Sequence, residues 1–447
     1  MAFQAVKGMR DFYPDEMRVR NWIIDTWRRV SLRNGFEEFD SPILEYLDLF
    51  TAKSGEGIAG ELFNLTDRGG RNLAIRPEMT PSLARMVNAK INSLPRPIKW
   101  FCSPQLCRAE KPQKGRTREF FQWNVDIIGE DSVLADAESV FVAVDALREF
   151  GLSPADVVVR YSSRALLSEL LRGLGVPDDR APKVMTVIDK RGGLPADVFA
   201  HMLGEAVPDN AAQAAIVRYL DLSSGGGDAT PAAIAESLLA TGHTGEAGGV
   251  SLSPAAAAAL GDLEEFQKAL AGFGVADWCR FDTRIIRGLA YYTGIVWEVY
   301  DAAESLRAVA GGGRYDNLLE ALGGPKVGAC GFGMGDVVLG ILLEEKGKLP
   351  AGLRQGSIDA FVIAEKDEAV PELLRTVSAL RGRGVAADFS YKRQTVGKQL
   401  QAANRRGARF AVIVHGDGRL GIKDLATGQQ TDVPAQDFLA EPKRHMT

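Results

Sequence analysis

One segment of the chain combines a cation, two phenols and a following strand. Arg287, Tyr291 and Tyr292 lie in a turn that ends at Gly294, and residues 295–299 after it are rich in β-branched side chains. A guanidinium group offers a planar fork of donors to phosphate oxygens. Two tyrosines offer flat walls and hydroxyl groups to a small ring. We therefore expect this segment to hold an anionic nucleotide beside an aromatic amino acid.

A second cluster of charge follows Arg108 and Glu110. The next loop carries four basic residues and no acid, and it leads into the strand Phe120–Asp126. Flanking strands would hold Arg108 in place while the loop reaches out to a polyphosphate. For the loop alone, a solvated hairpin tip is the alternative interpretation. The basic residues of the loop are Lys111, Lys114, Arg116 and Arg118.

Glu78 and Thr80 form a third candidate site, because a carboxylate and a hydroxyl group two residues apart could receive an ammonium group. The alternative is structural: Thr80 would cap the N-terminus of a helix, with Pro81 at its first position. Both interpretations can hold together.

Two glycine-rich runs, residues 310–316 and 328–336, complete the set. A glycine run permits close backbone approach but more often marks a turn. The second run is not followed by the acidic residue that a dinucleotide-binding βαβ unit requires. Closely spaced glycines before a helix could instead form the floor under a nucleotide.

The elements that must position these residues follow from periodicity and turn signals. A strand over 36–45 is interrupted by Pro42, so we expect it at a sheet edge or an interface. Residues 163–260 change to a helical character, with flexible stretches at 223–228 and 242–249. The other expected helices are 15–33, 80–90, 135–150, 163–174 and 254–272; the expected strands are 62–66, 72–76, 98–107, 119–128, 283–300 and 306–311, with a strand leading into a helix over 327–343.

After a linker at 346–357, strands alternate with short helices, which predicts a small α/β domain with a largely parallel sheet. Residues 381–409 hold eight basic residues against one acid, a net charge of +7. Phe389 and Tyr391 lie among them as possible stacking rings for bases. An ordinary solvated helix face is the alternative.

The composition of the chain limits the kinds of domain and site that it can form. The 447 residues predict about three domains. The net charge of −5 limits nucleic-acid binding to a local patch. The four cysteines form no CxxC pair and the four histidines lie apart from them, so we expect no metal site and a reducing, cytoplasmic location. No apolar run is long enough for a membrane span, and no targeting segment is expected at the N-terminus.

Together and in this order, the motifs resemble class II aminoacyl-tRNA synthetases, and within that class the histidyl-tRNA synthetase family. The resemblance spans nearly the whole chain. Residues 36–44, 108–126 and 331–339 look like the three class motifs, and 287–293 and 312–316 look like the two signatures of the histidine enzymes. The resemblance implies an α+β catalytic domain with an antiparallel sheet (1–162 and 261–345), a helical insertion (163–260), the linker (346–357) and a C-terminal α/β anticodon-binding domain (358–447).

The resemblance also implies roles for single residues. In the family, equivalent side chains bind histidine, ATP with Mg²⁺, and tRNA(His), in a cytoplasmic homodimer. The catalytic clamp on the α-phosphate would be Arg108 and Arg287. ATP would also meet Glu110, Arg116 and Phe120. Histidine would be held by Glu78, Thr80, Gln122, Asp126, Tyr291, Tyr292 and Tyr315. The tRNA would contact Gln113, Lys392, Arg393, Lys398 and Arg405.

Two positions depart from the family pattern. Ala290 stands where the first signature usually has aspartate, and Val338 stands where the third motif usually has an arginine that stacks on adenine. Losing that cation removes roughly 0.5–2 kcal/mol from ATP binding. Either another side chain substitutes, or nucleotide affinity is reduced. We expect an active variant branch, because the other motif residues persist.

Two alternatives to a ligase remain open. One is a regulatory paralogue that binds histidine, as in the regulatory subunit of ATP phosphoribosyltransferase, but the basic C-terminal segment argues against it. The other is a non-catalytic sensor of uncharged tRNA, which would not need Arg108 and Arg287.

Overall fold

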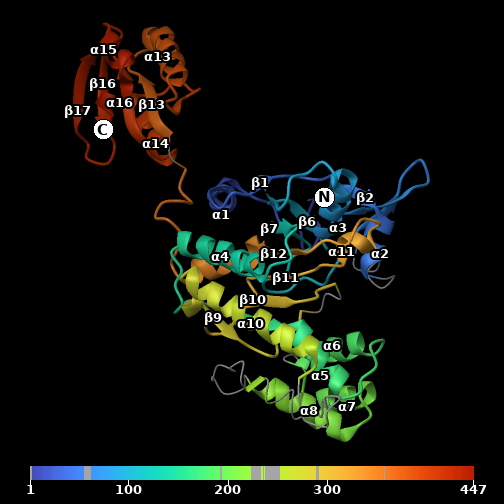
Figure 1. The fold of residues 1–447 in the computed structure, drawn as a ribbon. Coiled ribbons are helices and arrows are strands. Elements are labelled where there is room, and N and C mark those ends of the chain that lie inside the picture. Colours follow the sequence, from blue (N-terminus) through green and yellow to red (C-terminus); the bar gives the residue numbers. More distant parts are fainter. Residues whose placement is uncertain are drawn as a thin grey trace. The chain divides into compact units, whose positions relative to one another are not determined.

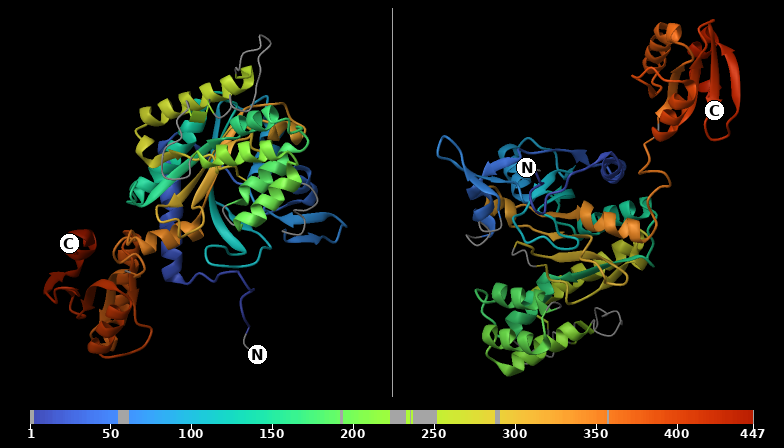
Figure 2. Two further views of the ribbon diagram at one scale, coloured as in Figure 1. Left: turned by 90° about the horizontal axis from the view of Figure 1, so that it is seen from below. Right: turned by 180° about the vertical axis from the view of Figure 1, so that it is seen from behind.

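The structure is a computed structural model, and it describes residues 3–54, 62–191, 194–222, 233–234, 236, 252–287, 291–356 and 358–446. The chain divides into two compact units, one formed by Met1–Asp11 and Arg20–Leu349 and the other by Phe12–Val19 and Pro350–Thr447 (Figures 1 and 2). The stretches expected to be flexible, 223–228 and 242–249, lie outside the described residues.

Within the described residues, the first unit is built on a nine-stranded sheet with the order β1-β5-β7-β12-β11-β10-β8-β9, in which β6 also pairs with β7. The central strand pairs, from β5 through β8, are all antiparallel. The strands are β1 (Glu37–Glu38), β5 (Ile98–Cys102), β6 (Gln105–Cys107), β7 (Glu119–Ile128), β8 (Val157–Ser163), β9 (Cys279–Phe281), β10 (Ile295–Asp301), β11 (Ala310–Arg314) and β12 (Ala329–Gly335). The antiparallel sheet expected for the catalytic domain is confirmed, and β1 lies at its edge as the proline-interrupted pattern indicates.

Helices pack on this sheet through alternate residues of its strands. Side chains two positions apart along a strand lie on the same face of the sheet. Trp123 of β7 therefore points away from its neighbours Gln122 and Asn124, and it stacks on Trp27 with ring centroids 6.0 Å apart. The Trp123 indole N–H also donates to Ser31 Oγ at 2.9 Å. The helices of this layer include α1 (Pro14–Arg33), α4 (Val133–Glu149), α10 (Pro254–Gly272) and α12 (Asp336–Glu345).

A smaller three-stranded sheet with the order β2-β4-β3 belongs to the same unit. The expected hairpin is present, and its turn is closed by Asp67, whose carboxylate accepts from the N–H groups of Gly69 and Arg71. The elements are β2 (Leu44–Tyr46), α2 (Leu47–Ser54), β3 (Asn64–Thr66), β4 (Asn72–Ile75), α3 (Thr80–Lys90) and α11 (Leu318–Ala321). This subdomain delivers Glu78 and Thr80, which lie between β4 and the first turn of α3.

The expected helical region follows β8. It contains α5 (Arg164–Gly173), α6 (Ala181–Asp189), α7 (Ala196–Ala206) and α8 (Asn210–Asp221), which lie together beside the main sheet (Figure 1). Helix α10 continues through residue 260 and packs on α4, where Phe141 and Phe273 stack with centroids 4.9 Å apart. The domain boundaries stay predictions, and the structure places one continuous helix across the boundary at 260.

Two strand predictions were wrong. The described residues between 283 and 294 form no strand. A turn lies at 283–284, and β10 begins only at Ile295. Likewise, β11 begins at Ala310 rather than at 306. The apolar residues Ile285 and Ile286 are buried by packing rather than by sheet pairing. An alternating pattern alone cannot distinguish these two causes of burial.

The second unit has a five-stranded sheet with the order β14-β13-β15-β16-β17. The first three strands are parallel, as expected, but β16 and β17 join as antiparallel strands that were not predicted from the sequence. Its elements are β13 (Ile358–Ala364), α13 (Val370–Gly382), β14 (Ala387–Phe389), α14 (Val396–Arg405), β15 (Ala408–Val414), β16 (Arg419–Asp424), β17 (Gln430–Pro434), α15 (Ala435–Ala440) and α16 (Pro442–His445). A short 3₁₀ helix lies at Asp367–Ala369 in this unit, and another lies at Ala276–Trp278 in the first unit.

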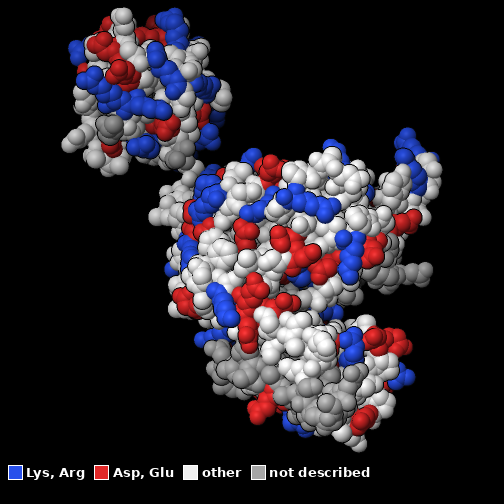
Figure 3. Space-filling model, in the orientation of Figure 1, with Lys and Arg blue, Asp and Glu red and all other residues white. Residues whose placement is uncertain are grey.

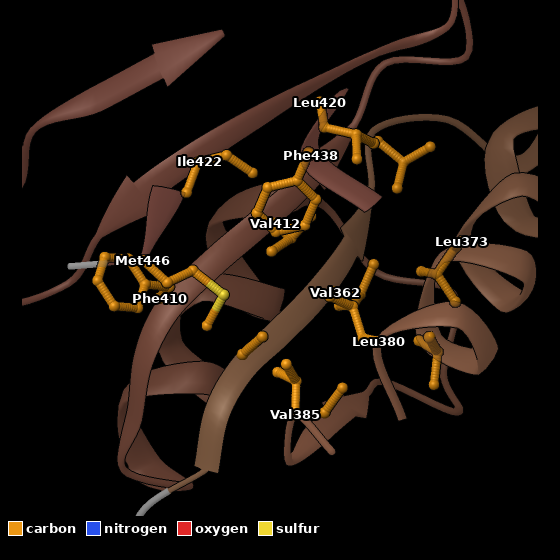
Figure 4. Packing of buried hydrophobic residues seen from close by; sticks show 14 of the residues in the cluster. Val362, Leu373, Leu380, Val385, Phe410, Val412, Leu420, Ile422, Phe438 and Met446 are labelled. Atoms are coloured by element: carbon orange, nitrogen blue, oxygen red, sulfur yellow. The ribbon is translucent and has the colours of Figure 1, made fainter. Parts of the chain in front are cut away.

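Strand β13 is buried on both faces, which explains its continuous apolar run. Val362 packs in one cluster with Leu373, Leu380 and Phe438, as Figure 4 shows. The neighbouring Phe361 and Ile363 belong to a second cluster with residues of α14. Helices therefore cover both faces of the parallel part of this sheet.

Candidate active site

Strand β7 supplies one row of site residues. Phe120, Gln122, Asn124 and Asp126 alternate along the strand, and all of them line one cavity of about 530 Å³. The six steps from Phe120 to Asp126 along an extended chain span about 20 Å. The strand therefore separates an aromatic ring at one end from a buried carboxylate at the other, with an amide group between them.

Glycines on the neighbouring strands make room for this row. Gly331 lies opposite Asp126 in the β12–β7 ladder, and a side-chain carbon at Gly331 would collide with the Asp126 carboxylate. A carbon at Gly333 would lie 2.7 Å from Gln122 Nε2. On β11, a carbon at Gly311 would collide with the guanidinium group of Arg287. The glycine runs thus form the floor of the cavity, because only hydrogen at these positions leaves space for the functional side chains.

Arg287 is held in an unusual backbone conformation. Its φ is +59°, in the left-handed region that non-glycine residues rarely adopt. Arg164 Nη1 donates to the Arg287 carbonyl oxygen at 2.9 Å. The side chain forms an ion pair with Glu298 Oε1 at 2.6 Å and lies over the Tyr292 ring. Backbone strain of about 1–3 kcal/mol is typical where tertiary contacts impose such a conformation at a binding site.

The charge state of Arg287 follows from these neighbours. Burial opposes the charged form, but the acidic groups of Tyr292 and Glu298 outweigh it and raise the pKa of Arg287. The guanidinium group therefore stays protonated inside the cavity. Its Nε–H is buried and has no hydrogen-bond partner among the described residues.

Arg108 and Phe120 lie together at the other end of the cavity. The Arg108 guanidinium carbon is 5.0 Å from the centroid of the Phe120 ring, and its Nε donates to the Pro77 carbonyl oxygen at 3.0 Å. Arg116 forms an ion pair with Glu110 across the loop. These contacts hold two cations and one aromatic ring at the cavity wall before any ligand binds.

Asp126 and Tyr315 form the buried end. The Tyr315 hydroxyl donates to Asp126 Oδ1. Burial, followed by the negative charge of Asp126, raises the pKa of Tyr315 well above its usual value, so the phenol stays neutral. Tyr291 and Tyr292 stand nearby with ring centroids 4.7 Å apart. Burial and then the charges of Tyr292 and Glu78 raise the pKa of Tyr291 as well. The pocket end therefore joins a fixed acceptor to aromatic walls, which suits a small ring that donates N–H.

Every residue expected to bind ATP or histidine lines this one cavity. They are Glu78, Thr80, Arg108, Glu110, Arg116, Phe120, Gln122, Asp126, Arg287, Tyr291, Tyr292 and Tyr315. The alternative role for Thr80 as a helix cap was wrong: Met79 is the N-cap residue and no side chain caps this helix. Ala290 lies outside the described residues.

Three further charged residues line the cavity that the motifs did not predict: Asp189, Glu298 and Arg307. Glu298 follows the turn that ends at Gly294 by only a few residues. Its place within the strand Ile295–Asp301 could have marked it as a site residue, because a charge in an apolar strand needs a partner. Asp189 ends α6 of the helical region. No local signal marks Asp189 or Arg307 as site residues.

Two conspicuous motif residues are structural instead. Arg314, in the signature at residues 312–316, donates from Nε to Asp136 at 2.9 Å, away from the cavity lining. Burial raises the pKa of Asp136 to about 6, in spite of the opposing effect of Arg314. Asp336 in the third motif forms an ion pair with Arg10 at 3.0 Å and accepts from the Phe121 N–H at 2.9 Å.

The expected tRNA-binding residues lie at the surface of their units. Gln113 is exposed in the basic loop of the first unit. Lys392, Arg393, Lys398 and Arg405 are exposed in the second unit. Figure 3 shows Lys and Arg side chains spread over the visible face of that unit, with acidic side chains between them.

An antiparallel sheet that presents these side chains, followed by a separate α/β unit, defines the class II aminoacyl-tRNA synthetase fold. A model of histidyl-tRNA synthetases matches residues 8–335, and a model of the anticodon-binding domain matches residues 359–444. The chain belongs to the histidyl-tRNA synthetase family.

Individual relatives match this chain over nearly its full length. A histidine–tRNA ligase of Opitutus terrae is 38% identical over 446 residues, covering 98% of this chain and 97% of that protein. The chloroplastic/mitochondrial histidine–tRNA ligase of Arabidopsis thaliana is 38% identical over 437 residues, with 97% and 85% covered. The crystal structure of a Nostoc histidyl-tRNA synthetase has the same fold, with a TM-score of 0.80, 24% identity and 99% of both chains covered.

A further structural neighbour from Bacillus halodurans, described as an ATP phosphoribosyltransferase regulatory subunit/histidyl-tRNA synthetase, has a TM-score of 0.72 at 21% identity and covers 93% of this chain and 99% of its own. That likeness concerns the fold alone. Among the helices that the structure describes, none is long and apolar enough to span a bilayer.

Proposed function

We propose that this protein is a histidine–tRNA ligase, which activates L-histidine with ATP to histidyl-adenylate and pyrophosphate and then transfers histidine to the 3′ end of its tRNA. The observation that carries the proposal is the joint lining of one cavity by Arg108, Arg287 and the Asp126–Tyr315 pair. Phosphate-binding cations and an imidazole acceptor thus occur in one space.

The amino acid would lie at the buried end. Asp126 accepts an N–H of the imidazole ring, and the neutral hydroxyl of Tyr315 fixes the position of that carboxylate. Tyr291 and Tyr292 form the walls of the ring pocket. An analogue without the N–H would leave the Asp126 carboxylate unpaired, which explains selectivity for histidine. The ammonium group would be received by Glu78, Thr80 and Gln122, which line the same cavity.

ATP would occupy the rest of the cavity. Arg108 and Arg287 clamp the α-phosphate, Arg116 meets the γ-phosphate, Glu110 meets the adenine edge and Phe120 its face. The histidine carboxylate attacks the α-phosphorus, and pyrophosphate leaves with the electron pair of the broken P–O bond. No protein nucleophile is required. Catalysis consists of positioning and of stabilising the charge that develops on phosphate oxygens.

Mg²⁺ would come with the nucleotide. It binds phosphate oxygens and keeps much of its water, and it needs only one or two carboxylates from a protein. Glu298 is a carboxylate of the cavity and pairs with Arg287, so the residues present fit such an ion. The ion would supply charge neutralisation on the polyphosphate, and the arginines would share this task.

Three further parts of the proposal concern assembly and location. Exposed apolar side chains at Ile43, Leu44 and Tyr46 support a homodimer through the region of the first motif, since neighbouring apolar groups exposed together are typical of an interface. The exposed basic residues of the second unit, together with Gln113, would bind tRNA(His). The cysteines are free, which fits the cytoplasm.

Pyrophosphate exchange tests the proposal directly. Purified protein should incorporate labelled pyrophosphate into ATP only when L-histidine is present, and it should then charge tRNA(His). The other amino acids serve as controls. A folded protein that binds histidine without exchange would instead be a regulatory paralogue, and one that binds tRNA alone would be a sensor.

A further inference from the structure

Arg307 occupies the same part of the cavity as Val338, the position where the third motif of the family carries an arginine. Arg307 lies on the loop between β10 and β11, whereas Val338 lies in the first turn of α12. A side-chain carbon at Gly115 would be 3.4 Å from Val338 Cγ2 and 3.8 Å from Arg307 Cδ. The two side chains therefore approach the same point of the basic loop from different elements.

The other arginines of the cavity are already engaged. Arg287 pairs with Glu298, Arg116 pairs with Glu110, and Arg108 donates to a carbonyl oxygen. Arg307 has neither a hydrogen bond nor an ion pair with any residue that the structure describes. Among the cavity arginines that the structure describes, Arg307 is thus the one with no donor engaged by the protein.

The electrostatic surroundings of Arg307 give the same indication. Burial and then the positive charge of Arg116 lower the pKa of Arg307, while Glu110, Glu298 and Tyr300 oppose this effect. Two cations that face one cavity repel each other, and a bound anion or an aromatic ring face offsets this repulsion. A bound nucleotide would supply both.

We propose that Arg307 supplies the nucleotide-binding cation that Val338 does not, by stacking its guanidinium plane on the purine of ATP. The inference rests on the proposed function for the identity of the nucleotide. Val338 keeps an apolar surface at this point and is nearly buried. The positive charge comes from Arg307 on the β10–β11 loop. The site therefore keeps a cation although Val338 replaces the usual arginine of the third motif.

Arg307→Ala tests this assignment against Arg280→Ala, an exposed arginine on β9 outside the cavity. We expect the Arg307 variant to raise KM for ATP in pyrophosphate exchange roughly 2- to 30-fold, with KM for histidine little changed. The control should match the wild type. An unchanged KM for ATP in Arg307→Ala, with normal thermal unfolding, would overturn the inference.

A second variant distinguishes substitution of the cation from general disturbance. Val338→Arg in the Arg307→Ala background should restore much of the lost ATP affinity, because it returns the cation to its usual element. Competition by adenosine, which lacks phosphates, should weaken in Arg307→Ala as well. If adenosine binding is unaffected while ATP binding falls, Arg307 contacts phosphate and the stacking proposal is wrong.

Calorimetric titration with ATP separates this inference from the proposed function. A wild-type protein without histidine-dependent exchange would refute the ligase function. The ATP titration of the wild type, Arg307→Ala and Arg280→Ala would still decide the role of Arg307. Equal dissociation constants in all three proteins would refute it.

Discussion

The cavity of the first unit and the basic segment of the second unit both gather arginines, but they hold them differently. In the cavity, Arg287 comes from a left-handed turn, Arg108 follows β6 and Arg116 lies on a loop, and each has a protein partner. In the second unit, Lys392, Arg393 and Lys398 are neighbours in sequence and lie exposed to solvent. Only Arg393 among these three has an ion pair among the described residues, with the exposed Asp367.

The difference corresponds to two kinds of ligand. A small anion that reacts must be held in one geometry, so its cations are preorganised by buried partners. A large polyanion is bound by many solvated charges that exchange counterions, and precise fixation of each charge is unnecessary. Loss of one cation should therefore be severe in the cavity and mild at the surface of the second unit.

The largest expected effect is that of Arg287→Ala. The variant should lower the rate of histidyl-adenylate formation by about 10²- to 10³-fold, since it removes a preorganised donor at the reacting phosphate. Histidine binding should remain largely intact, because the Asp126–Tyr315 pair is unchanged. Pyrophosphate exchange and calorimetric titration with histidine measure the two quantities separately.

Arg284→Ala is the matched control for Arg287. Arg284 lies on the same segment and pairs with Asp282 at 2.7 Å, but it does not line the cavity. Its loss should leave exchange near the wild-type rate. Near-native exchange in Arg287→Ala itself would show that the guanidinium group has no role in adenylation.

A smaller effect is expected from charge reversal in the second unit. The double variant Lys392→Glu, Arg393→Glu should reduce kcat/KM for tRNA in aminoacylation by roughly tenfold or more and weaken its salt dependence. Pyrophosphate exchange should not change, because neither residue belongs to the cavity. Equal damage to both reactions would contradict the separation of tasks between the two regions.

The smallest effect concerns a charge that contributes to stability instead of binding. His415 Nδ1 lies 2.9 Å from Glu365 Oε2, and this hydrogen bond raises the pKa of His415 above its ordinary value, with smaller effects of Asp432 and Asp417. A raised folded-state pKa means that the stabilisation is fully present below about pH 6.5 and is lost as pH rises through the folded pKa.

His415→Gln should remove this dependence. Chemical unfolding between about pH 6 and 9 should show a loss of at most about 1 kcal/mol in the wild type and a flatter profile in the variant. An unchanged slope would assign the pH dependence to other groups. Aminoacylation and exchange at one fixed pH should be nearly equal in both proteins.

Local signals in the sequence sufficed for much of the molecule. The helix Pro14–Arg33, the hairpin closed at Asp67 and the parallel part of the second unit follow periodicity and turn chemistry. The chemical types of the cavity residues were also recognisable, because Arg, Tyr and Gly in motif order are informative without coordinates. The identity of the ligands followed from the family resemblance of those motifs.

Tertiary structure decided the rest, because it depends on pairing between distant segments. Residue alternation shows that Gln122 and Asp126 share a face, but only the β12–β7 register shows why Gly331 must lack a side chain. The carbonyl oxygen of Arg287, in its left-handed conformation, accepts from Arg164, more than a hundred residues earlier in the chain. Arg307 carries no motif signal at all, and its place beside Val338 is a product of folding alone.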